Sequence, residues 1–376
     1  MSDTQTITAP AKEWIAALTR LTPAMAGKKP VPILHGIRIS PASGTIAGYN
    51  YETSATTVLA GSEGEGYDFL GSWRWLLDAI RTRTSRDKSA PVTVSLDGDK
   101  LTVAACGYEA SVEAMPIADY PSVPSPEPEV SVSIPATELR AALRRVNIAA
   151  SKDDYLPILA CARVSMKDGE VELYTTDRYR LAYDSFTGDG EGEAKFLLSG
   201  KVIKSVDRFL TGDVIFGIHD NRIVISTEKV TYTTIATDGD YPKIESLFPR
   251  ELKASFEVDR VVLLEGARVA SAMSERNNPC FVSLREAGAE VTYSFGLFGE
   301  SKSPTAGVQF AEGDLEPSKF AMTPRYLIET LEQIPTSHVR ISYVSQTKPL
   351  LFTPEGVAAS EDRISKHLIM PVRMPS

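Results

Sequence analysis

Cysteine, histidine and long apolar segments are scarce in this sequence, which has three cysteines, four histidines and no apolar run of 18 residues among its 376 positions. Three widely spaced cysteines exclude a disulfide framework and are typical of a reducing cytosol. The lack of a long apolar run excludes a transmembrane helix. Because Lys12, Glu13 and Arg20 would interrupt the core of a signal peptide, we expect a cytoplasmic protein that does not enter a membrane.

Sequence patterns for catalysis and for metal or phosphate binding are also missing. None of the histidines lies in an HExxH pattern, and no cysteine pair has the spacing of metal ligands. Segment 199–201 (SGK) lacks the upstream glycine of a phosphate-binding loop, and the glycine-rich segments 64–66 and 188–192 are acidic, which predicts hairpin tips. Asp153 and Asp154 have two interpretations, a carboxylate pair for acid–base chemistry or a solvated loop, and the loop is favoured. We therefore expect no enzyme activity, no catalytic residue, no metal site and no cofactor.

The sequence does contain an internal repeat. Residues 7–10 (ITAP) recur 125 positions later as 132–135 (VSIP), and the same offset carries 32–34 (PIL) onto 157–159 (PIL). A fainter third copy repeats Arg145-Val146 as Arg268-Val269. Several blocks at one offset indicate three domains of similar size. We place them at residues 1–127, 128–250 and 251–376.

Each copy is predicted to be an α+β unit with two helices and about eight short strands. The second helix of each copy is expected at about 72–84, 200–210 and 323–334, from the apolar spacing in those segments. Between the helices, β-branched or alternating segments such as 100–103 (KLTV) and 230–235 (VTYTTI) predict strands.

Positive charge is concentrated in the predicted helices, although the whole chain is acidic, with 40 Lys and Arg against 49 Asp and Glu. The four helices of the first two copies, with their ends, hold 13 Lys and Arg but five Asp and Glu, a net charge of +8 in a chain of −9. The helices of the third copy hold four cations and six anions. This bias favours contact with phosphate groups without base readout, whereas any single basic helix is also explained by a solvated face.

Three short segments are the most specific parts of the sequence: 176–182 (TDRYRLA), 240–242 (DYP) and 367–374 (HLIMPVRM). With the three α+β repeats and the basic helices, they make the whole chain similar to the bacterial DNA polymerase III β subunits, the sliding clamps. Arg178 followed by an aromatic residue resembles actinobacterial members. The resemblance implies a DNA clamp fold, in which two chains join head to tail as a homodimeric ring with helices around a central hole.

The same resemblance implies a protein that encircles double-stranded DNA without sequence preference and tethers other proteins for processive replication. The implied partners are the DNA polymerase III α subunit, the clamp loader, and other polymerases and repair proteins that bind through short linear motifs. The implied location is the cytoplasm, at the nucleoid. Two alternatives stay open: a specialised second clamp copy, for instance one that tolerates an inhibitor, and an α+β repeat enzyme with a carboxylate site at Asp153 or Asp177.

The resemblance also implies three sets of site residues. A hydrophobic cleft for partner peptides would be lined by Leu159, Thr176, Arg178, Tyr179, Arg180, Leu181, Pro242, Ser246, Leu247, Leu368, Ile369, Met370, Pro371, Val372, Arg373 and Met374. DNA would be contacted by Arg20, Arg74, Arg81, Arg83, Arg140, Arg144, Arg145, Lys201, Lys204 and Arg208 on or next to the helices, and by Lys28, Lys29 and Lys152 in loops. Ring closure would bring Ala110 and Val112 against Ser271 and Ala272 of the other copy. A core role explains Leu159, Leu181 and Ile369 equally well, and a solvated loop explains the three loop lysines equally well.

Overall fold

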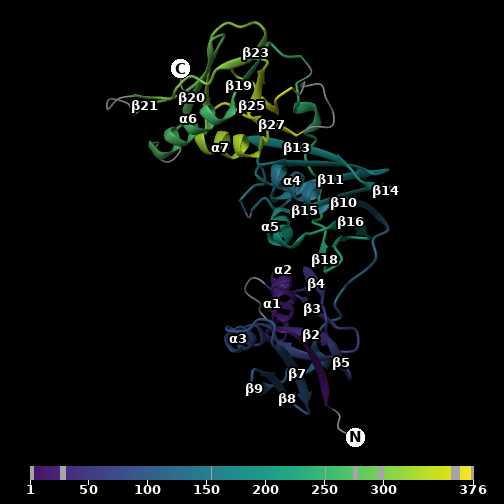
Figure 1. The fold of residues 1–376 in the computed structure, drawn as a ribbon. Helices are drawn as coiled ribbons and strands as arrows, with labels where there is room; N and C mark the ends of the chain where they lie inside the picture. The colour runs from purple at the N-terminus through teal and green to yellow at the C-terminus, as the bar shows by residue number, and fades with distance from the viewer. Residues whose placement is uncertain are drawn as a thin grey trace. The chain divides into compact units, whose positions relative to one another are not determined.

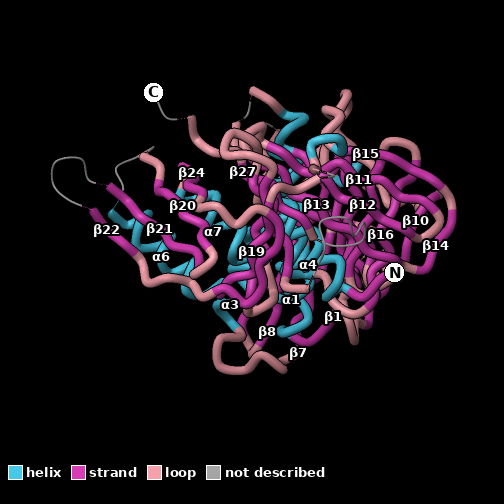
Figure 2. The backbone as a smooth tube through the Cα atoms, turned by 90° about the horizontal axis from the view of Figure 1, so that it is seen from above, coloured by secondary structure: helices cyan, strands magenta, loops and turns pink. Residues whose placement is uncertain are grey.

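The structure, a computed structural model, describes residues 4–25, 31–153, 155–249, 251–273, 278–294, 300–356 and 365–373 (Figure 1). Contacts between residues divide the chain into two compact units. Unit 1 comprises Met1–Thr137, Asp189–Gly192 and Lys204–Ala236, and unit 2 comprises Glu138–Gly188, Glu193–Ile203 and Thr237–Ser376. Strand is more abundant than helix in the described ranges (Figure 2). The predicted α+β class is confirmed, whereas the domain boundaries near residues 127 and 250 stay predictions.

Unit 1 holds two antiparallel sheets. The first has the order β5-β1-β7-β8-β9 and is formed by β1 (Gln5–Pro10), β5 (Glu63–Glu65), β7 (Pro91–Asp97), β8 (Lys100–Ala105) and β9 (Tyr108–Glu113). The second has the order β14-β10-β16-β17-β18-β4-β3-β2-β6 and is formed by β2 (Gly36–Ser40), β3 (Thr45–Tyr49), β4 (Thr53–Val58), β6 (Phe69–Ser72), β10 (Val130–Pro135), β14 (Asp189–Glu191), β16 (Asp213–His219), β17 (Arg222–Ser226) and β18 (Val230–Ile235). Because β18 pairs with β4, with Tyr232 opposite Ala55, strands of the first two sequence repeats share one sheet.

The acidic glycine segments, predicted as hairpin tips, form short edge strands instead. β5 pairs with β1 and β14 pairs with β10, each at the margin of its sheet. Glycine is needed at the centre of both strands, because a Cβ on Gly64 would lie 2.8 Å from the Thr6 carbonyl oxygen and one on Gly190 would lie 2.1 Å from that of Ser131. Turn-forming composition is visible in the sequence, but this close approach to a neighbouring backbone is not.

The helices α1 (Ala11–Arg20), α2 (Thr22–Met25) and α3 (Trp73–Arg83) belong to unit 1. On α1, Trp14 and Leu18 are fully buried, and on α3 Leu76 and Ile80 are fully buried at the same four-residue spacing. The indole N–H of Trp73 donates to the carbonyl oxygen of Leu18 at 2.8 Å. The helix predicted at 72–84 is therefore confirmed, and α3 packs beside α1.

Unit 2 also holds two antiparallel sheets. The larger has the order β15-β11-β12-β13-β27-β26-β25-β19-β23 and is formed by β11 (Cys161–Lys167), β12 (Glu170–Thr176), β13 (Arg180–Thr187), β15 (Glu193–Ser199), β19 (Ala254–Asp259), β23 (Val308–Gly313), β25 (His338–Tyr343), β26 (Leu350–Pro354) and β27 (Lys366–Ile369). The smaller has the order β22-β21-β20-β24 and is formed by β20 (Cys280–Arg285), β21 (Gly288–Ser294), β22 (Glu300–Lys302) and β24 (Ser318–Met322). Pairing of β13 with β27 joins strands of the second and third repeats. Within the described ranges each third of the chain holds nine strands, close to the predicted number.

Most of α4 (Ala136–Asn147) and of α5 (Gly200–Val206) belongs to unit 2, as do α6 (Arg260–Met273) and α7 (Pro324–Gln333). The helix predicted at 200–210 is shorter than expected, because the chain tightens after Val206 into a 3₁₀ turn at Asp207–Phe209. The helix predicted at 323–334 is confirmed as α7. No helix in the described part of the chain is long and apolar enough to cross a membrane.

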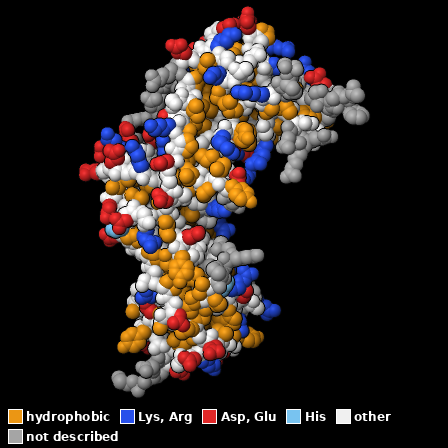
Figure 3. Space-filling view, turned by 180° about the vertical axis from the view of Figure 1, so that it is seen from behind, with side chains coloured by type: hydrophobic (Ala, Val, Ile, Leu, Met, Phe, Trp, Pro, Cys, Tyr) orange, Lys and Arg blue, Asp and Glu red, His pale blue; other side chains and the backbone are white. Residues whose placement is uncertain are grey.

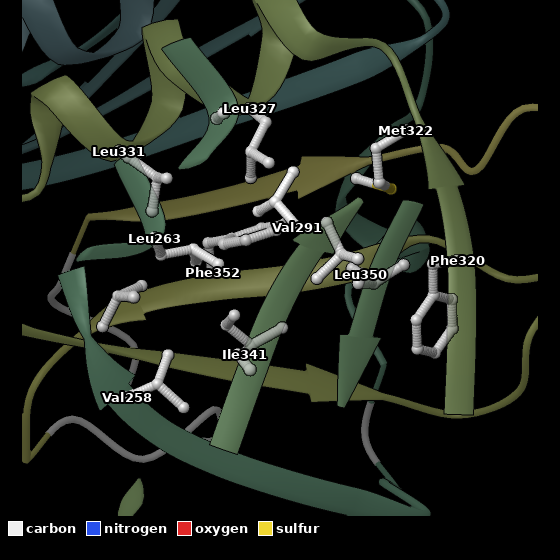
Figure 4. Close-up of a cluster of buried hydrophobic side chains, with 14 of the residues drawn as sticks. Val258, Leu263, Val291, Phe320, Met322, Leu327, Leu331, Ile341, Leu350 and Phe352 are labelled. Atoms are coloured by element: carbon white, nitrogen blue, oxygen red, sulfur yellow. The ribbon is translucent and has the colours of Figure 1, made fainter. Parts of the chain in front are cut away.

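A large core cluster of unit 2 lies between α6, α7 and both sheets. Figure 4 shows Leu263 of α6 and Leu327 and Leu331 of α7 among side chains of the strands, including Val291 and Phe352. These five side chains are at most 2% exposed. Full burial of one such side chain stabilises the folded state by about 1.5–3 kcal/mol. The core therefore holds α7 firmly, and α7 supports the site described next.

Candidate functional site

The turn between β12 and β13 is held by its own polar side chains. Oδ1 of Asp177 accepts hydrogen bonds from the backbone N–H groups of Tyr179 and Arg180, both at 3.0 Å. The hydroxyl of Thr176 donates to the Arg180 carbonyl oxygen at 2.7 Å and accepts from the Arg178 N–H at 3.1 Å. Arg178 has a φ of 77°, a left-handed conformation that this network stabilises. Arg178 and Tyr179 are exposed at this turn, and the exposed fraction of Tyr179 is 58%.

Arg180 points inward from this turn and is 4% exposed. Its guanidinium binds Asp177 at 3.0 Å and Glu329 of α7 at 2.5 Å, and it lies 4.4 Å from the ring centroid of Tyr326. Burial acts to raise the pKa of Glu329, but hydrogen bonds from Arg325 and Arg180 outweigh it and lower the pKa. Arg180 thus anchors the turn to α7, and direct contact between Arg180 and a bound peptide stays a prediction.

The last described segment of the chain runs alongside the turn. β27 pairs with β13, with Leu368 opposite Leu181. Beyond β27, the N–H of Met370 donates to the Tyr179 carbonyl oxygen at 2.8 Å, and the N–H of Val372 donates to the Ala321 carbonyl oxygen at 2.7 Å. Met370 is 37% exposed; Pro371 and Val372 are half-buried, and Arg373 is exposed. Met374 lies outside the described residues.

A third segment, residues 241–248, packs against the same sheet. Ile244 shares a buried cluster with Leu181 and Leu368, and Tyr241 and Phe248 pack against that cluster. The Tyr241 hydroxyl also accepts the N–H of Thr176 at 3.0 Å. Three segments that are far apart in the sequence therefore meet around one apolar cluster. Pro242, Ser246 and Leu247, the predicted site residues of this segment, are exposed.

The predicted peptide-binding residues divide into a buried and an exposed group. Leu159, Leu181 and Ile369 are 7%, 3% and 0% exposed, which agrees with the core role left open for them. Tyr179, Leu247 and Met370 are large hydrophobic side chains that are exposed. Figure 3 shows that exposed hydrophobic side chains are interspersed with charged ones on one face of the molecule. Flexible Met and Leu side chains over an apolar floor suit apolar side chains of varied shape.

Sequence reasoning missed the aromatic and basic side chains beneath this surface. Tyr174 and Tyr183 lie opposite each other in the β12–β13 ladder, with ring centroids 4.7 Å apart. Arg163 of β11 lies above the Tyr174 ring at 4.3 Å and pairs with Glu245 at 2.6 Å. Alternate residues of a strand share one face of the sheet, so Tyr174 lies on the face of Thr176 and Tyr183 on the face of Leu181. That spacing was the sequence signal that could have placed the two tyrosines beside the site.

In unit 1, predicted DNA-binding cations gather around α1 and α3. Arg81 Nη2 of α3 donates to the Thr19 hydroxyl of α1 at 3.4 Å, next to Arg20. The backbone carbonyl of Arg20 accepts the Tyr232 hydroxyl at 2.9 Å. Burial, first of all, raises the pKa of Tyr232, and the charges of Arg20 and Arg208 act against it. Arg20, Arg81 and Arg208 are therefore neighbours on one surface.

The remaining unit 1 cations of the predicted set differ in their surroundings. Arg74 is exposed and pairs with Asp78 across one helical turn at 3.3 Å. Arg83 is half-buried, and its Nη1 donates to the Ala79 carbonyl oxygen at 3.2 Å. Lys204 is exposed at the end of α5. Lys28 and Lys29 lie outside the described residues.

In unit 2 the predicted DNA-binding cations lie on α4, on α5 and in one loop. Arg144, Lys152 and Lys201 are exposed and Arg140 is half-buried. Nδ2 of Asn147, at the end of α4, donates to the Gly200 carbonyl oxygen at the start of α5 at 3.2 Å, so these helix ends adjoin. Arg145 differs: its guanidinium binds both carboxylate oxygens of the buried Asp184, at 2.5 and 3.0 Å.

The residues predicted for ring closure lie on β9 and on α6. β9 is the edge strand of the five-stranded sheet, where Ala110 is half-buried and Val112 is exposed. Ser271 and Ala272 lie in the last turn of α6, and Ala272 is exposed. Three of these four residues have small side chains, and the contact predicted between the two pairs stays a prediction. Across the described residues, no group of three or more His, Cys, Asp and Glu is placed to hold a metal ion.

The chain is similar to proteins of one family. Residues 133–243 match the family described as DNA polymerase III beta subunit, central domain. A beta sliding clamp of Streptomyces coelicolor is 30% identical over 378 residues, which cover 96% of each chain. The beta sliding clamp homolog GriR of Streptomyces muensis is 26% identical, covering 93% of this chain and 94% of its own length. The crystal structure of the DNA polymerase sliding clamp from Bacillus subtilis matches with a TM-score of 0.89 at 19% identity, covering 99% of this chain and all of that one.

Proposed function

This chain belongs to the family of bacterial DNA polymerase III β subunits, the sliding clamps, and from that membership we propose how its surfaces are used. The proteins of this family are non-catalytic processivity factors. The alternative of an α+β repeat enzyme with a carboxylate site is therefore not retained. The clamp fold predicted from the sequence is confirmed by the match to the Bacillus subtilis structure. The observation that carries the function is the identity to the Streptomyces clamp along 96% of both chains.

Two copies of the chain join head to tail into a ring around duplex DNA. The basic surfaces of α1, α3, α4 and α5, together with the 3₁₀ turn after α5, face the phosphates. The contacts are made by Arg20, Arg81 and Arg208 in unit 1 and by Arg144 and Lys201 in unit 2. Phosphate contacts of this kind carry no sequence information. Arg145 is left out of the proposed contact set, because its charge is already neutralised by two hydrogen bonds to Asp184.

Enclosure, rather than tight binding, keeps the protein on DNA. Individual phosphate contacts are weakened by salt, and weak contacts let a ring move along the duplex. The test compares loaded protein on a circular plasmid and on the same plasmid after linearisation, separated by gel filtration. We expect retention on the circle and loss from the linear form, with free protein eluting at twice the mass of one chain. Equal loss from both forms contradicts enclosure.

The surface around Tyr179, Leu247 and Met370 receives linear peptides of partner proteins. Its support is the buried cluster of Leu181, Ile244 and Leu368 beneath these side chains and the turn that Asp177 and Arg180 hold in place. The partners proposed for it are the DNA polymerase III α subunit, the clamp loader, and other polymerases and repair proteins. The protein acts in the cytoplasm, at the nucleoid.

Ring closure uses the free edge of β9 in one copy and the end of α6 in the other. An edge strand offers unpaired backbone groups that a second chain can bind. Because Ala110, Ser271 and Ala272 carry small side chains, each of them buries little apolar area at this contact. The domains proposed for the ring are residues 1–127, 128–250 and 251–376, three from each copy.

A specialised second clamp copy is the second candidate, favoured by the similarity to the GriR homolog. Deletion of the gene distinguishes the two. A replicative clamp is required for growth, whereas a second copy is dispensable as long as another clamp gene remains.

A further inference from the structure

The segment that carries Leu247 is attached to the sheet through side chains. Its backbone hydrogen bonds from Leu247 N–H to the Ile244 carbonyl and from Phe248 N–H to the Glu245 carbonyl, at 3.0 and 3.4 Å, close a 3₁₀ turn within the segment itself. Attachment comes from the buried Ile244, from the packing of Tyr241 and Phe248, and from the charge of Glu245. The position of Leu247 therefore depends on how these side chains are held.

Arg163 is the residue that holds Glu245 in place. It lies on β11, directly opposite Tyr174 in the ladder with β12. Its Nη1 lies 2.6 Å from Oε1 of Glu245, and the exposed fractions of the two side chains are 18% and 50%. Its guanidinium carbon lies 4.3 Å from the Tyr174 ring centroid. Stacking on the ring restricts the side chain, so less conformational entropy is lost when it binds a carboxylate.

The contacts form a closed circuit around Ile244. From Arg163 the circuit passes to Tyr174, then to Tyr183 at 4.7 Å between ring centroids, then to Phe248 at 5.9 Å. The chain itself leads back from Phe248 to Glu245, which binds Arg163. Burial acts to raise the pKa of Glu245, but backbone hydrogen bonds and Arg163 outweigh it and lower the pKa, so Glu245 is ionised at neutral pH. The turn is thereby held at both ends, by the charge pair of Glu245 with Arg163 at one end and by the edge-to-face contact of Phe248 with Tyr183 at the other.

We propose that Arg163 is a positioning residue for partner binding, which fixes the Leu247 turn above the apolar cluster by pairing with Glu245. This inference rests on the proposed peptide site, because Leu247 is one of its exposed apolar residues. Arg163 itself need not touch the peptide. Loss of the pair leaves the turn attached by Ile244, Tyr241 and Phe248 but free to move at its charged end, and a bound peptide must then order it again.

The experiment measures binding of a labelled synthetic peptide, copied from the clamp-binding segment of the DNA polymerase III α subunit, by fluorescence anisotropy. Arg163→Gln and Glu245→Gln are each expected to weaken peptide affinity by about three- to tenfold. The double variant is expected to bind no more weakly than either single variant, because both remove the same interaction. Arg163→Lys, which keeps the charge, is expected to recover part of the affinity.

Lys195→Gln is the matched control. Lys195 and Glu193 both lie on β15, the strand next to β11, and form an exposed ion pair 3.7 Å apart. Loss of this pair should leave peptide affinity unchanged. Thermal unfolding of each variant checks folding. Glu245 lies on an exposed turn, so Glu245→Gln tests the inference even where Arg163→Gln fails to fold. Unchanged affinity in Glu245→Gln, or additive losses in the double variant, would overturn the inference while the site stands. Wild-type protein that does not bind the peptide would overturn the proposed site, and this inference with it.

Discussion

Truncation of Leu247 and Met370, two exposed apolar side chains of the proposed peptide site, tests the site directly. Leu247 is 53% exposed and Met370 is 37% exposed, so a bound peptide can bury about half of one side chain and a third of the other. Full burial of a Leu or Met side chain is worth about 1.5–3 kcal/mol. For Leu247→Ala combined with Met370→Ala we expect a loss of about 1–2 kcal/mol in binding free energy, or roughly five- to thirtyfold in affinity.

The same substitutions should hardly affect folding. Both side chains are already partly in water, and the hydrogen bond from the Met370 N–H to the Tyr179 carbonyl involves only backbone atoms. Fluorescence anisotropy with the labelled α-subunit peptide measures affinity, and thermal unfolding measures stability. Val261→Ala is the control, because Val261 is 51% exposed on α6 and lies outside the proposed site. A double variant that binds the peptide as tightly as the wild type refutes the placement of the site.

Two further predictions concern stability. Burial above all, and then the charges of Arg145 and Arg180, lower the pKa of His367 from 6.5 to about 3. The unfolded chain therefore binds a proton at this histidine more readily than the folded chain. The free energy of unfolding is expected to fall by up to about 1.4 kcal/mol per pH unit as the pH drops from about 6.5 toward 3. Urea denaturation across that range checks this, and a slope that persists unchanged in His367→Gln contradicts it. Asp184→Asn leaves the guanidinium of Arg145 mostly buried beside a neutral amide, and it is expected to lower the free energy of unfolding by about 2–3 kcal/mol. Asp78→Asn removes the exposed pair with Arg74 and should lower it by less than about 0.5 kcal/mol. Equal effects in the two variants would show that burial of the Asp184 pair adds nothing.

Local sequence patterns predicted the elements better than their partners. The apolar spacing around Leu76 and Ile80 predicts α3, because a helix buries residues at that period wherever its core lies. No local pattern predicts that β18 pairs with β4 or β13 with β27, because either strand carries a composition that fits several neighbours. The three repeats are therefore visible in the sequence, whereas the sheets shared between repeats are not.

The candidate site stays a prediction, but the structure shows which of its segments adjoin and how its charges are paired. The TDRYRLA and HLIMPVRM segments do meet in space, through the pairing of Leu181 with Leu368. Arg180 and Arg145 were both expected to face a ligand, yet each is held by a carboxylate from a distant part of the chain. Partners as remote in sequence as Glu329 cannot be inferred from spacing, and an isolated arginine gives no sign of its burial.

The two acidic glycine strands have a consequence for the protein in crowded solution. β5 and β14 end their sheets with carboxylates on either side of a central glycine, and like charges disfavour a second such strand alongside. Copies that meet at these margins repel one another, which discourages open-ended fibres of laterally added chains. β9 lacks such a glycine and carries Ala110 and Val112 between its acidic residues. It is therefore the margin of the five-stranded sheet at which a second chain meets less repulsion.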